Sequence, residues 1–259
     1  MIGRLPVFIG GIVLGFGITW LGGWPFRVLV AAAWIGLMVE ISLAASQSMG
    51  LSIRKYLWLD LIFFGLLPIG FIVTGRPALL AAAVLSWLFL LLLFFPTNRS
   101  GLTRWLLSVV VQPYIAMGVF SFFSLRGYGW SWPACALMVV VLADTGSYLV
   151  GRRFGRHLLA PSISPAKTIE GAVGGVVLAS GACAFFLTTR HHIPLCPALV
   201  ASVGLSILAV LGDLLESFLK RGLDLKDFGT LLPGHGGLFD RLDSLMPVSI
   251  GLLLFLKLM

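Results

Sequence analysis

Long apolar runs alternate with short polar turns along the whole sequence. Uncharged runs of roughly 18 to 20 residues, the length of a membrane-spanning helix, are separated by turns such as Trp24-Pro25 and Pro96-Thr97-Asn98. This pattern predicts nine transmembrane helices. Their expected ranges are residues 5–23, 27–45, 57–74, 78–95, 105–123, 132–150, 169–187, 196–215 and 243–259.

Composition supports the same fold class. The 259 residues are 59% hydrophobic and 11% charged, whereas about a quarter of the residues in a soluble domain are charged. We therefore expect an all-α, polytopic transmembrane helical bundle with no room for a separate soluble domain. Residues 1–130 would supply its N-terminal helices and residues 131–259 its C-terminal helices, as one integral membrane unit.

The basic residues predict how the bundle is oriented. With nine spans, thirteen of the eighteen Lys and Arg residues fall on the side of the N-terminus and the even-numbered loops. Because cytoplasmic loops carry such an excess, that side should face the cytoplasm, in a multi-pass protein of the cell (inner) membrane. Topology and anionic lipid then account for most of the net charge of +8, and no nucleic-acid partner is needed.

Most of the ten acidic residues lie in the second half of the chain. Glu40 and Asp60 stand alone in the first half, where a structural ion pair is the expected role. The other eight fall between residues 144 and 243. Carboxylates at membrane depth are costly unless they are paired, metal-bound or hydrated, so these eight are candidates for function.

The segment SFLKRGLDLKDFGTLLPGHGGLFDRLD, residues 217–243, carries eight charged residues in 27 positions. Asp240 and Asp243 share a face of the last helix if that helix begins near residue 239. Acids on two adjoining helices can hold a divalent cation such as Mg²⁺, which prefers oxygen ligands. The helix that leads into this segment presents four polar residues on one face: Asp213, Glu216, Ser217 and Lys220.

A glycine-rich turn, residues 232–237, lies between these helices. Its backbone can direct N–H groups toward an anion, although a simple connection between helices would also explain the glycines. Lys220-Arg221 and Lys226-Asp227 precede the turn, and Asp240-Arg241 follows it. Bases for phosphate, acids for a metal and a glycine-rich turn together indicate a phosphoryl- or nucleotidyl-transfer site.

A second polar cluster, residues 143–171, falls on the same predicted side of the membrane. Asp144 shares a helix face with Ser147 and Tyr148, and a basic, glycine-containing loop follows. Thr168 and Glu170 are typical of a helix start, and ordinary capping is one explanation for both. Lys167 at that helix N-terminus would suit a triphosphate. His191 and His192 lie in a loop on the opposite side, where we expect them to be solvated.

Three blocks of this chain resemble the signature of the phosphatidate cytidylyltransferases, or CDP-diacylglycerol synthases. Asp144 and residues 164–171 resemble further family blocks, except that Ala166 stands where a second lysine is expected. The specific resemblance covers residues 140–250, and the first half resembles the family only as a hydrophobic bundle. The three blocks are Ser217-Phe218-Leu219-Lys220-Arg221, Lys226-Asp227 and Leu232-Pro233-Gly234-His235-Gly236-Gly237-Leu238-Phe239-Asp240-Arg241-Leu242-Asp243.

The resemblance implies a Mg²⁺-dependent reaction of CTP with phosphatidate that gives CDP-diacylglycerol and pyrophosphate. Asp213 and Asp240 are then the first-choice metal ligands, with Asp144 and Asp243 as further partners, and the family implies a second cation. The expected catalytic residues are Asp213, Lys220, Arg221, Lys226, Asp227, His235, Asp240, Arg241 and Asp243. The expected substrate-binding residues are Lys167, Glu170, Ser217, Gly234, Gly236 and Gly237.

Two other classes of protein share some of these features. A CTP-dependent lipid kinase would use similar acids and bases but should lack this C-terminal signature. An ion-coupled transporter would also bury acids, but it predicts inverted repeats and charges near the bilayer midplane. The expected partners are CTP, phosphatidate and membrane lipids, and a homodimer is left open.

Overall fold

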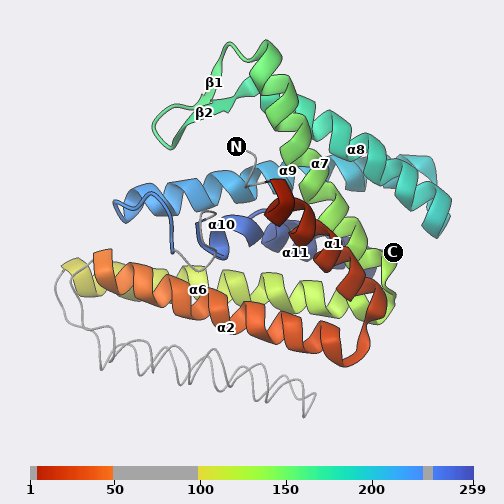
Figure 1. Cartoon of the computed structure of the whole chain (residues 1–259). Helices are drawn as coiled ribbons and strands as arrows, with labels where there is room; N and C mark the ends of the chain where they lie inside the picture. Colours follow the sequence, from red (N-terminus) through yellow and green to blue (C-terminus); the bar gives the residue numbers. More distant parts are fainter. Residues whose placement is uncertain (1–4, 49–98, 230–235) are drawn as a thin grey trace. The chain divides into compact units, whose positions relative to one another are not determined.

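The computed structural model describes residues 5–48, 99–229 and 236–259, and these are mostly helical (Figure 1). The chain forms two compact units. The first comprises Met1–Leu29, Met117–Gly222 and Arg241–Met259, and the second comprises Val30–Ala116 and Leu223–Asp240. The division at residue 130 that we expected from the sequence stays a prediction.

Each described long helix overlaps a predicted span, although several ends differ by four to seven residues, and the short helix α10 matches none. In the first half they are α1 (Leu5–Leu21), α2 (Gly23–Ser48) and α6 (Arg99–Leu125), followed by a short 3-10 helix, Arg126–Tyr128. In the second half they are α7 (Ser131–Phe154), α8 (Ile169–His191), α9 (Leu195–Gly222), α10 (Phe239–Leu242) and α11 (Leu245–Leu258). The predicted spans at residues 57–74 and 78–95 lie outside the described residues, so the total of nine stays a prediction.

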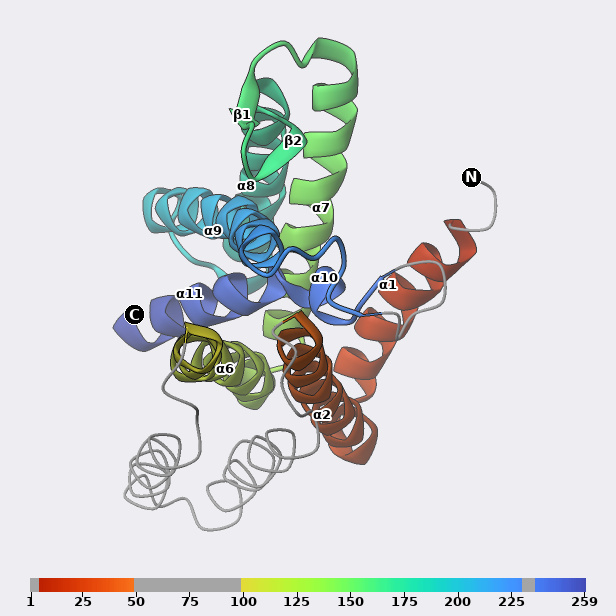
Figure 2. The ribbon, with the colours of Figure 1, turned by 90° about the vertical axis from the view of Figure 1, so that its left-hand side faces the viewer.

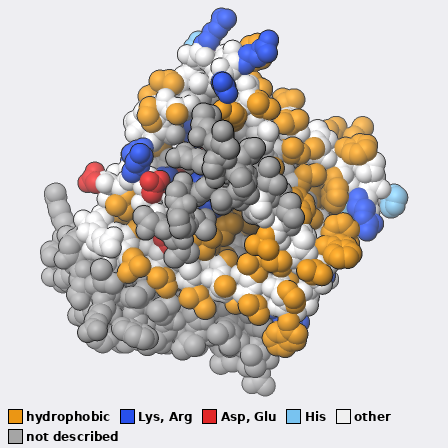
Figure 3. Space-filling view, in the orientation of Figure 1, with side chains coloured by type: hydrophobic (Ala, Val, Ile, Leu, Met, Phe, Trp, Pro, Cys, Tyr) orange, Lys and Arg blue, Asp and Glu red, His pale blue; other side chains and the backbone are white. Residues whose placement is uncertain are grey.

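Four of the described helices are long and apolar enough to cross a membrane: α2, α7, α8 and α9. The apolar helix α11 is shorter. Large hydrophobic side chains on α8 and α9, among them Val177, Phe185 and Val200, are exposed. Figure 3 shows such side chains over much of the coloured surface, with Lys and Arg gathered where α7 meets the hairpin described below. An apolar exterior of this kind is the surface of a membrane protein.

Small residues bring α7 and α8 together in the first unit (Figure 2). A Cβ atom added at Gly146 would lie 2.9 Å from Cα of Gly175, and one added at Gly171 would lie 2.8 Å from the Ser147 carbonyl oxygen. Close backbone approach through small residues is a common way for membrane helices to associate. Gly171 and Gly175, four residues apart on α8, therefore let the backbone of α7 approach this helix closely.

The loop expected between α7 and α8 contains a short antiparallel hairpin. Its strands are β1 (Leu158–Ala160) and β2 (Ser164–Thr168), paired with Leu158 opposite Thr168 and Ala160 opposite Ser164. The all-α expectation missed this element because its strands are too short for a period-2 pattern to show. Thr168 caps α8 by accepting a hydrogen bond from the Gly171 N–H, as the sequence predicted.

The prediction for the two histidines is correct only in part. His192 is exposed in a left-handed conformation (φ 55°) at the end of α8. His191 is half-buried, and its ring stacks on Trp132 with centroids 3.8 Å apart. The aromatic partner lies 59 residues earlier in the sequence, so local pattern could not reveal this contact.

Candidate active site

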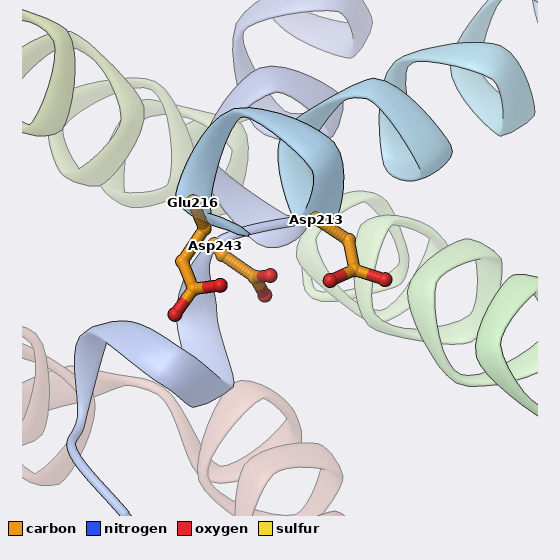
Figure 4. Close-up of side chains that lie close together, drawn as sticks. All are labelled: Asp213, Glu216 and Asp243. Atoms are coloured by element: carbon orange, nitrogen blue, oxygen red, sulfur yellow. The ribbon is translucent and has the colours of Figure 1, made fainter. Parts of the chain in front are cut away.

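Three carboxylates meet where α9 passes the turn between α10 and α11. Asp213 and Glu216 lie on α9, and Asp243 lies in the turn; the three side chains point toward a common space (Figure 4). Each offers one oxygen, and these oxygens lie within 4.8 Å of one another. A donor set made only of carboxylate oxygens fits a hard cation, so this cluster is a candidate metal site.

Gly212 allows the turn to approach α9 this closely. A Cβ atom at position 212 would lie 2.8 Å from the Asp243 carbonyl oxygen and 2.9 Å from Cα of Ser244. The Ser244 hydroxyl also donates a 2.9 Å hydrogen bond to the Ala209 carbonyl. The missing side chain and the serine bridge together hold Asp243 beside the two acids of α9.

Two lysines pair with the acids of α9. Lys167 Nζ, from β2, lies 2.6 Å from Asp213 Oδ1 and donates a 3.4 Å hydrogen bond to the Ser217 hydroxyl. Lys220 Nζ lies 2.6 Å from Glu216 Oε1, one helical turn away, and both side chains are largely buried. Within the described residues no such ion pair reaches Asp243.

The electrostatic environment of Asp243 favours a neighbouring cation. Asp243 lies between the helices α10 and α11 and is buried. This burial, together with the negative charge of Asp213, raises the pKa of the Asp243 carboxyl above its ordinary value. A positive ion among the three oxygens would stabilise the ionised form of Asp243.

A cavity of about 450 Å³ opens beside Asp213. Residues from four elements line it: α7, the hairpin, α8 and α9. Its ionisable lining residues are Asp144, Tyr148, Arg152, Lys167 and Asp213. The charges of Asp213, Lys167 and Arg241 all act on Asp144. Because Asp213 belongs to both the cavity and the acid cluster, a ligand in the cavity would lie next to the candidate metal site.

A hydrogen bond joins the hairpin to the C-terminal end of α9. Arg221 Nε donates a 3.3 Å hydrogen bond to the Ile163 carbonyl in the hairpin turn. The loops expected after the sixth and eighth spans therefore lie at the same end of this unit. Polar residues of the segment 143–171 therefore contact polar residues at the end of α9.

The second unit holds Lys226, Asp227 and the described residues of the last signature block up to Asp240. Asp240 Oδ2 accepts a 2.8 Å hydrogen bond from the Gly237 N–H, and Oδ1 accepts a 3.5 Å bond from the Phe228 N–H. Lys226 and Asp227 are exposed. Gly236 has φ +80°, a conformation that side chains disfavour.

Sequence comparison adds an independent result. The sequence model of the cytidylyltransferase family matches residues 2–259. The chain belongs to the cytidylyltransferase family. The resemblance that the sequence blocks indicated is thereby confirmed.

Curated members of this family show how far the similarity extends. A phosphatidate cytidylyltransferase of Staphylococcus haemolyticus is 43% identical over 136 residues, which are 51% of this chain and 52% of that protein. The protein of the same name from Bacillus subtilis is 42% identical over 137 residues, 51% of each chain. That from Mycobacterium bovis is 38% identical over 155 residues, 59% of this chain and 49% of that protein. The chain spans about half the length of the curated relatives it matches.

The structure brings some of the predicted site residues together and places others elsewhere. Lys167, Asp213, Ser217 and Asp243 come together, with Asp144 across the cavity. Glu170 does not line the cavity: it accepts hydrogen bonds from the Arg156 and His157 N–H groups at the start of the hairpin. Gly234 and His235 lie outside the described residues.

Glu216 was one of the eight candidate acids, but no metal-binding role was predicted for it from the sequence. The sequence pattern placed this acid on the same helix face as Asp213, three residues apart, and that spacing is the signal from which its position could have been inferred. What the sequence could not show is that the turn at Asp243 reaches the same point, because that approach depends on Gly212.

Proposed function

We propose that this cytidylyltransferase-family protein is a phosphatidate cytidylyltransferase. A phosphate oxygen of phosphatidate would attack the α-phosphorus of CTP and form a new P–O bond. The bond from that phosphorus to the bridging oxygen would break, and its electron pair would leave with pyrophosphate. The phosphate of the lipid is already a nucleophile, so positioning and charge neutralisation would suffice.

The observation that carries this proposal is the cavity that joins Lys167 and Asp213 to the acid cluster. Its volume, about 450 Å³, is within the range of small-molecule sites. Basic side chains from α7 and from the hairpin line it. Lys167 is partly exposed and Arg152 lines the same cavity. These cations would hold phosphate oxygens, and Lys220, Arg221 and Arg241 would add positive charge at its edge.

Asp213, Glu216 and Asp243 would hold Mg²⁺, with Asp144 and Asp240 as further ligands. Oxygen ligands lie about 2.1 Å from Mg²⁺ and hence at most about 4.2 Å from one another. The oxygens within 4.8 Å in the cluster would reach that spacing by small side-chain rotations. A bound Mg²⁺ would supply positive charge to the reacting phosphates. Lys167, whose Nζ lies 2.6 Å from Asp213 Oδ1, would orient that carboxylate.

The glycine-rich turn and the residues that flank it would bind the nucleotide. Lys226 is exposed and lies in a polar loop, where a water-soluble triphosphate can arrive. Gly236 would present its backbone N–H group to the triphosphate, and Gly237, whose N–H is bound by Asp240, would lie beside it. We place all of these groups at the cytoplasmic face of the cell (inner) membrane, because CTP is a cytoplasmic metabolite and the basic loops lie there.

The proposal is tested with purified full-length protein in detergent micelles containing phosphatidate. Addition of CTP and Mg²⁺ should release pyrophosphate and CDP-diacylglycerol in equal amounts. Chelation of the metal should stop both products. Folded protein that yields neither product with long-chain phosphatidate would contradict the proposed function, and lipid phosphorylation would indicate the kinase instead.

A further inference from the structure

Glu40 is a buried carboxylate in the second unit that the proposed mechanism does not use. It lies on α2 and is only 4% exposed. We expected a structural ion pair at this position. Within the described residues, its hydrogen-bond partners are two backbone N–H groups of the segment that follows the glycine-rich turn.

These two hydrogen bonds join parts of the chain that are almost 200 positions apart. Glu40 Oε2 accepts a 2.6 Å bond from the Leu238 N–H and a 3.1 Å bond from the Phe239 N–H. The preceding N–H, that of Gly237, is bound by Asp240. Two carboxylates therefore bind three consecutive N–H groups and fix the backbone that leads into α10.

The second oxygen of Glu40 lies against two glycines. A Cβ atom at Gly229 would lie 2.5 Å from Glu40 Oε1, and one at Gly237 would overlap the same oxygen. Because neither position can carry a side chain while Glu40 keeps its place, the carboxylate and the two glycines fit one another. Phe228, next to Gly229, and Phe239, two residues after Gly237, stack edge to face with centroids 5.0 Å apart.

We propose that Glu40 is a positioning residue for the nucleotide side of the site. It holds Gly237 to Phe239 in place, and through them Asp240. Its link to CTP rests on the proposed function, which assigns Gly236, Gly237 and Asp240 to the nucleotide and its metal. Glu40 itself touches neither substrate nor metal in this scheme.

The position of Glu40 predicts a particular kinetic pattern. Without the acceptor oxygen of Glu40, residues 237–239 would adopt the arrangement that binds CTP for only a fraction of the time. The apparent affinity for CTP would fall by that fraction, whereas saturating CTP would restore the competent arrangement. Loss of two hydrogen bonds to a charged acceptor corresponds to about a tenfold effect or more. A general loss of folded enzyme would instead lower kcat and leave KM unchanged.

The test compares five variants in the full-length protein. Glu40→Met removes the acceptor at similar size and should raise KM for CTP at least about tenfold, with kcat within about twofold and KM for phosphatidate unchanged. Glu40→Gln keeps an acceptor oxygen and should stay close to wild type. Gly237→Ala should raise KM for CTP to a similar extent. The double variant Glu40→Met/Gly237→Ala should have a KM for CTP no higher than that of the more impaired single variant. Ser46→Ala is the control, since Ser46 is buried on α2 and its hydroxyl has no partner in the described part of the chain.

A second readout does not depend on catalysis. Hydrogen exchange of peptides that cover residues 236–242 should show protected Leu238 and Phe239 amides in wild type. Glu40→Met should lose this protection locally, and Ser46→Ala should keep it. If wild type makes no CDP-diacylglycerol, the proposed function fails, and this exchange result still decides the positioning role.

Three results would overturn the inference. One is a fall in kcat at constant KM for CTP in Glu40→Met. Another is a Glu40→Gln variant as impaired as Glu40→Met, which would mean that the charge acts and not the hydrogen bonds. The third is unchanged exchange at Leu238 and Phe239. If Glu40→Met does not fold, Glu40→Asp, which withdraws the carboxylate by one methylene, is subject to the same three criteria.

Discussion

Asp213 is the residue that the acid cluster and the cavity share. Its carboxylate pairs with Lys167. One of its oxygens lies within 4.8 Å of a carboxylate oxygen of Glu216 and of one of Asp243. The change Asp213→Asn keeps size and packing but removes the charge. We expect the rate of cytidylyl transfer to fall at least ~100-fold, with normal membrane insertion and folding.

The matched control for that change is Asp224→Asn. Asp224 is an exposed acid with φ 55°, a conformation that asparagine tolerates. Activity should stay near wild type. Near-wild-type turnover of Asp213→Asn at low Mg²⁺ would contradict a metal-binding role for Asp213. The same measurement on Asp240→Asn tests the ligand that the sequence paired with it.

Two basic residues should distinguish the substrates. Arg221 ends a membrane helix and bonds to the hairpin turn, near the level of a lipid phosphate, whereas Lys226 lies farther along the loop. Arg221→Ala should mainly raise KM for phosphatidate and Lys226→Ala mainly that for CTP, each about tenfold to a hundredfold. Steady-state kinetics in mixed micelles, with one substrate varied at a time, measures both. A Lys226→Ala variant that weakens only phosphatidate would reverse the assignment.

For single residues, the sequence predicted which residue types come together in the candidate site, but not all of their contacts. The grouping of Lys167 with Asp213 and Ser217 could be inferred from motif blocks. The contacts of Glu170 could not, because they depend on a hairpin with no periodic signal. Glu40 is the clearest case: its partners are backbone N–H groups, which no residue pattern encodes.

Among the structural elements, the approach of α9 to the α10–α11 turn determines the geometry of the acid cluster. Gly212→Ala would place a methyl group against the Asp243 carbonyl and Ser244, and the turn would have to move away. We expect a destabilisation of about 1–3 kcal/mol and a higher Mg²⁺ requirement, because Asp243 is displaced from Asp213 and Glu216.

Gly204 on the same helix provides the control. A Cβ atom there meets no atom within 4 Å, so Gly204→Ala should change only helix propensity, by up to about 1 kcal/mol in favour of folding. Thermal unfolding and Mg²⁺ titration of both variants give the comparison. Equal behaviour of the two alanine variants would show that close approach at Gly212 has no role in the site.

The helices were the most predictable elements. Hydropathy alone located α7, α8 and α9 to within a few residues, except that α9 continues to Gly222. That extension is amphipathic, and its charged face carries Glu216 and Lys220, so a count of uncharged residues ended too early. The hairpin was missed because three- and five-residue strands carry too little pattern.

For the whole molecule, the predicted orientation can be measured on α8. This helix has 23 residues, about 35 Å at 1.5 Å per residue, which is enough to cross a hydrocarbon core of about 30 Å. Cysteines at Ser162 and Arg190, both exposed, should label from opposite sides, with Ser162 cytoplasmic. The background needs Cys196→Ser, because native Cys196 is exposed near the Arg190 end. Labelling of both sites from one side would contradict the topology.

In the proposed reaction, the α-phosphate of CTP is transferred, together with its cytidine, to a lipid phosphate. The most direct test supplies purified protein, phosphatidate and Mg²⁺ with CTP that is radiolabelled at either the α- or the γ-phosphate. We predict that the α-label enters the lipid fraction as CDP-diacylglycerol and that the γ-label appears only in pyrophosphate. Transfer of the γ-label to lipid, with release of CDP, would contradict this account.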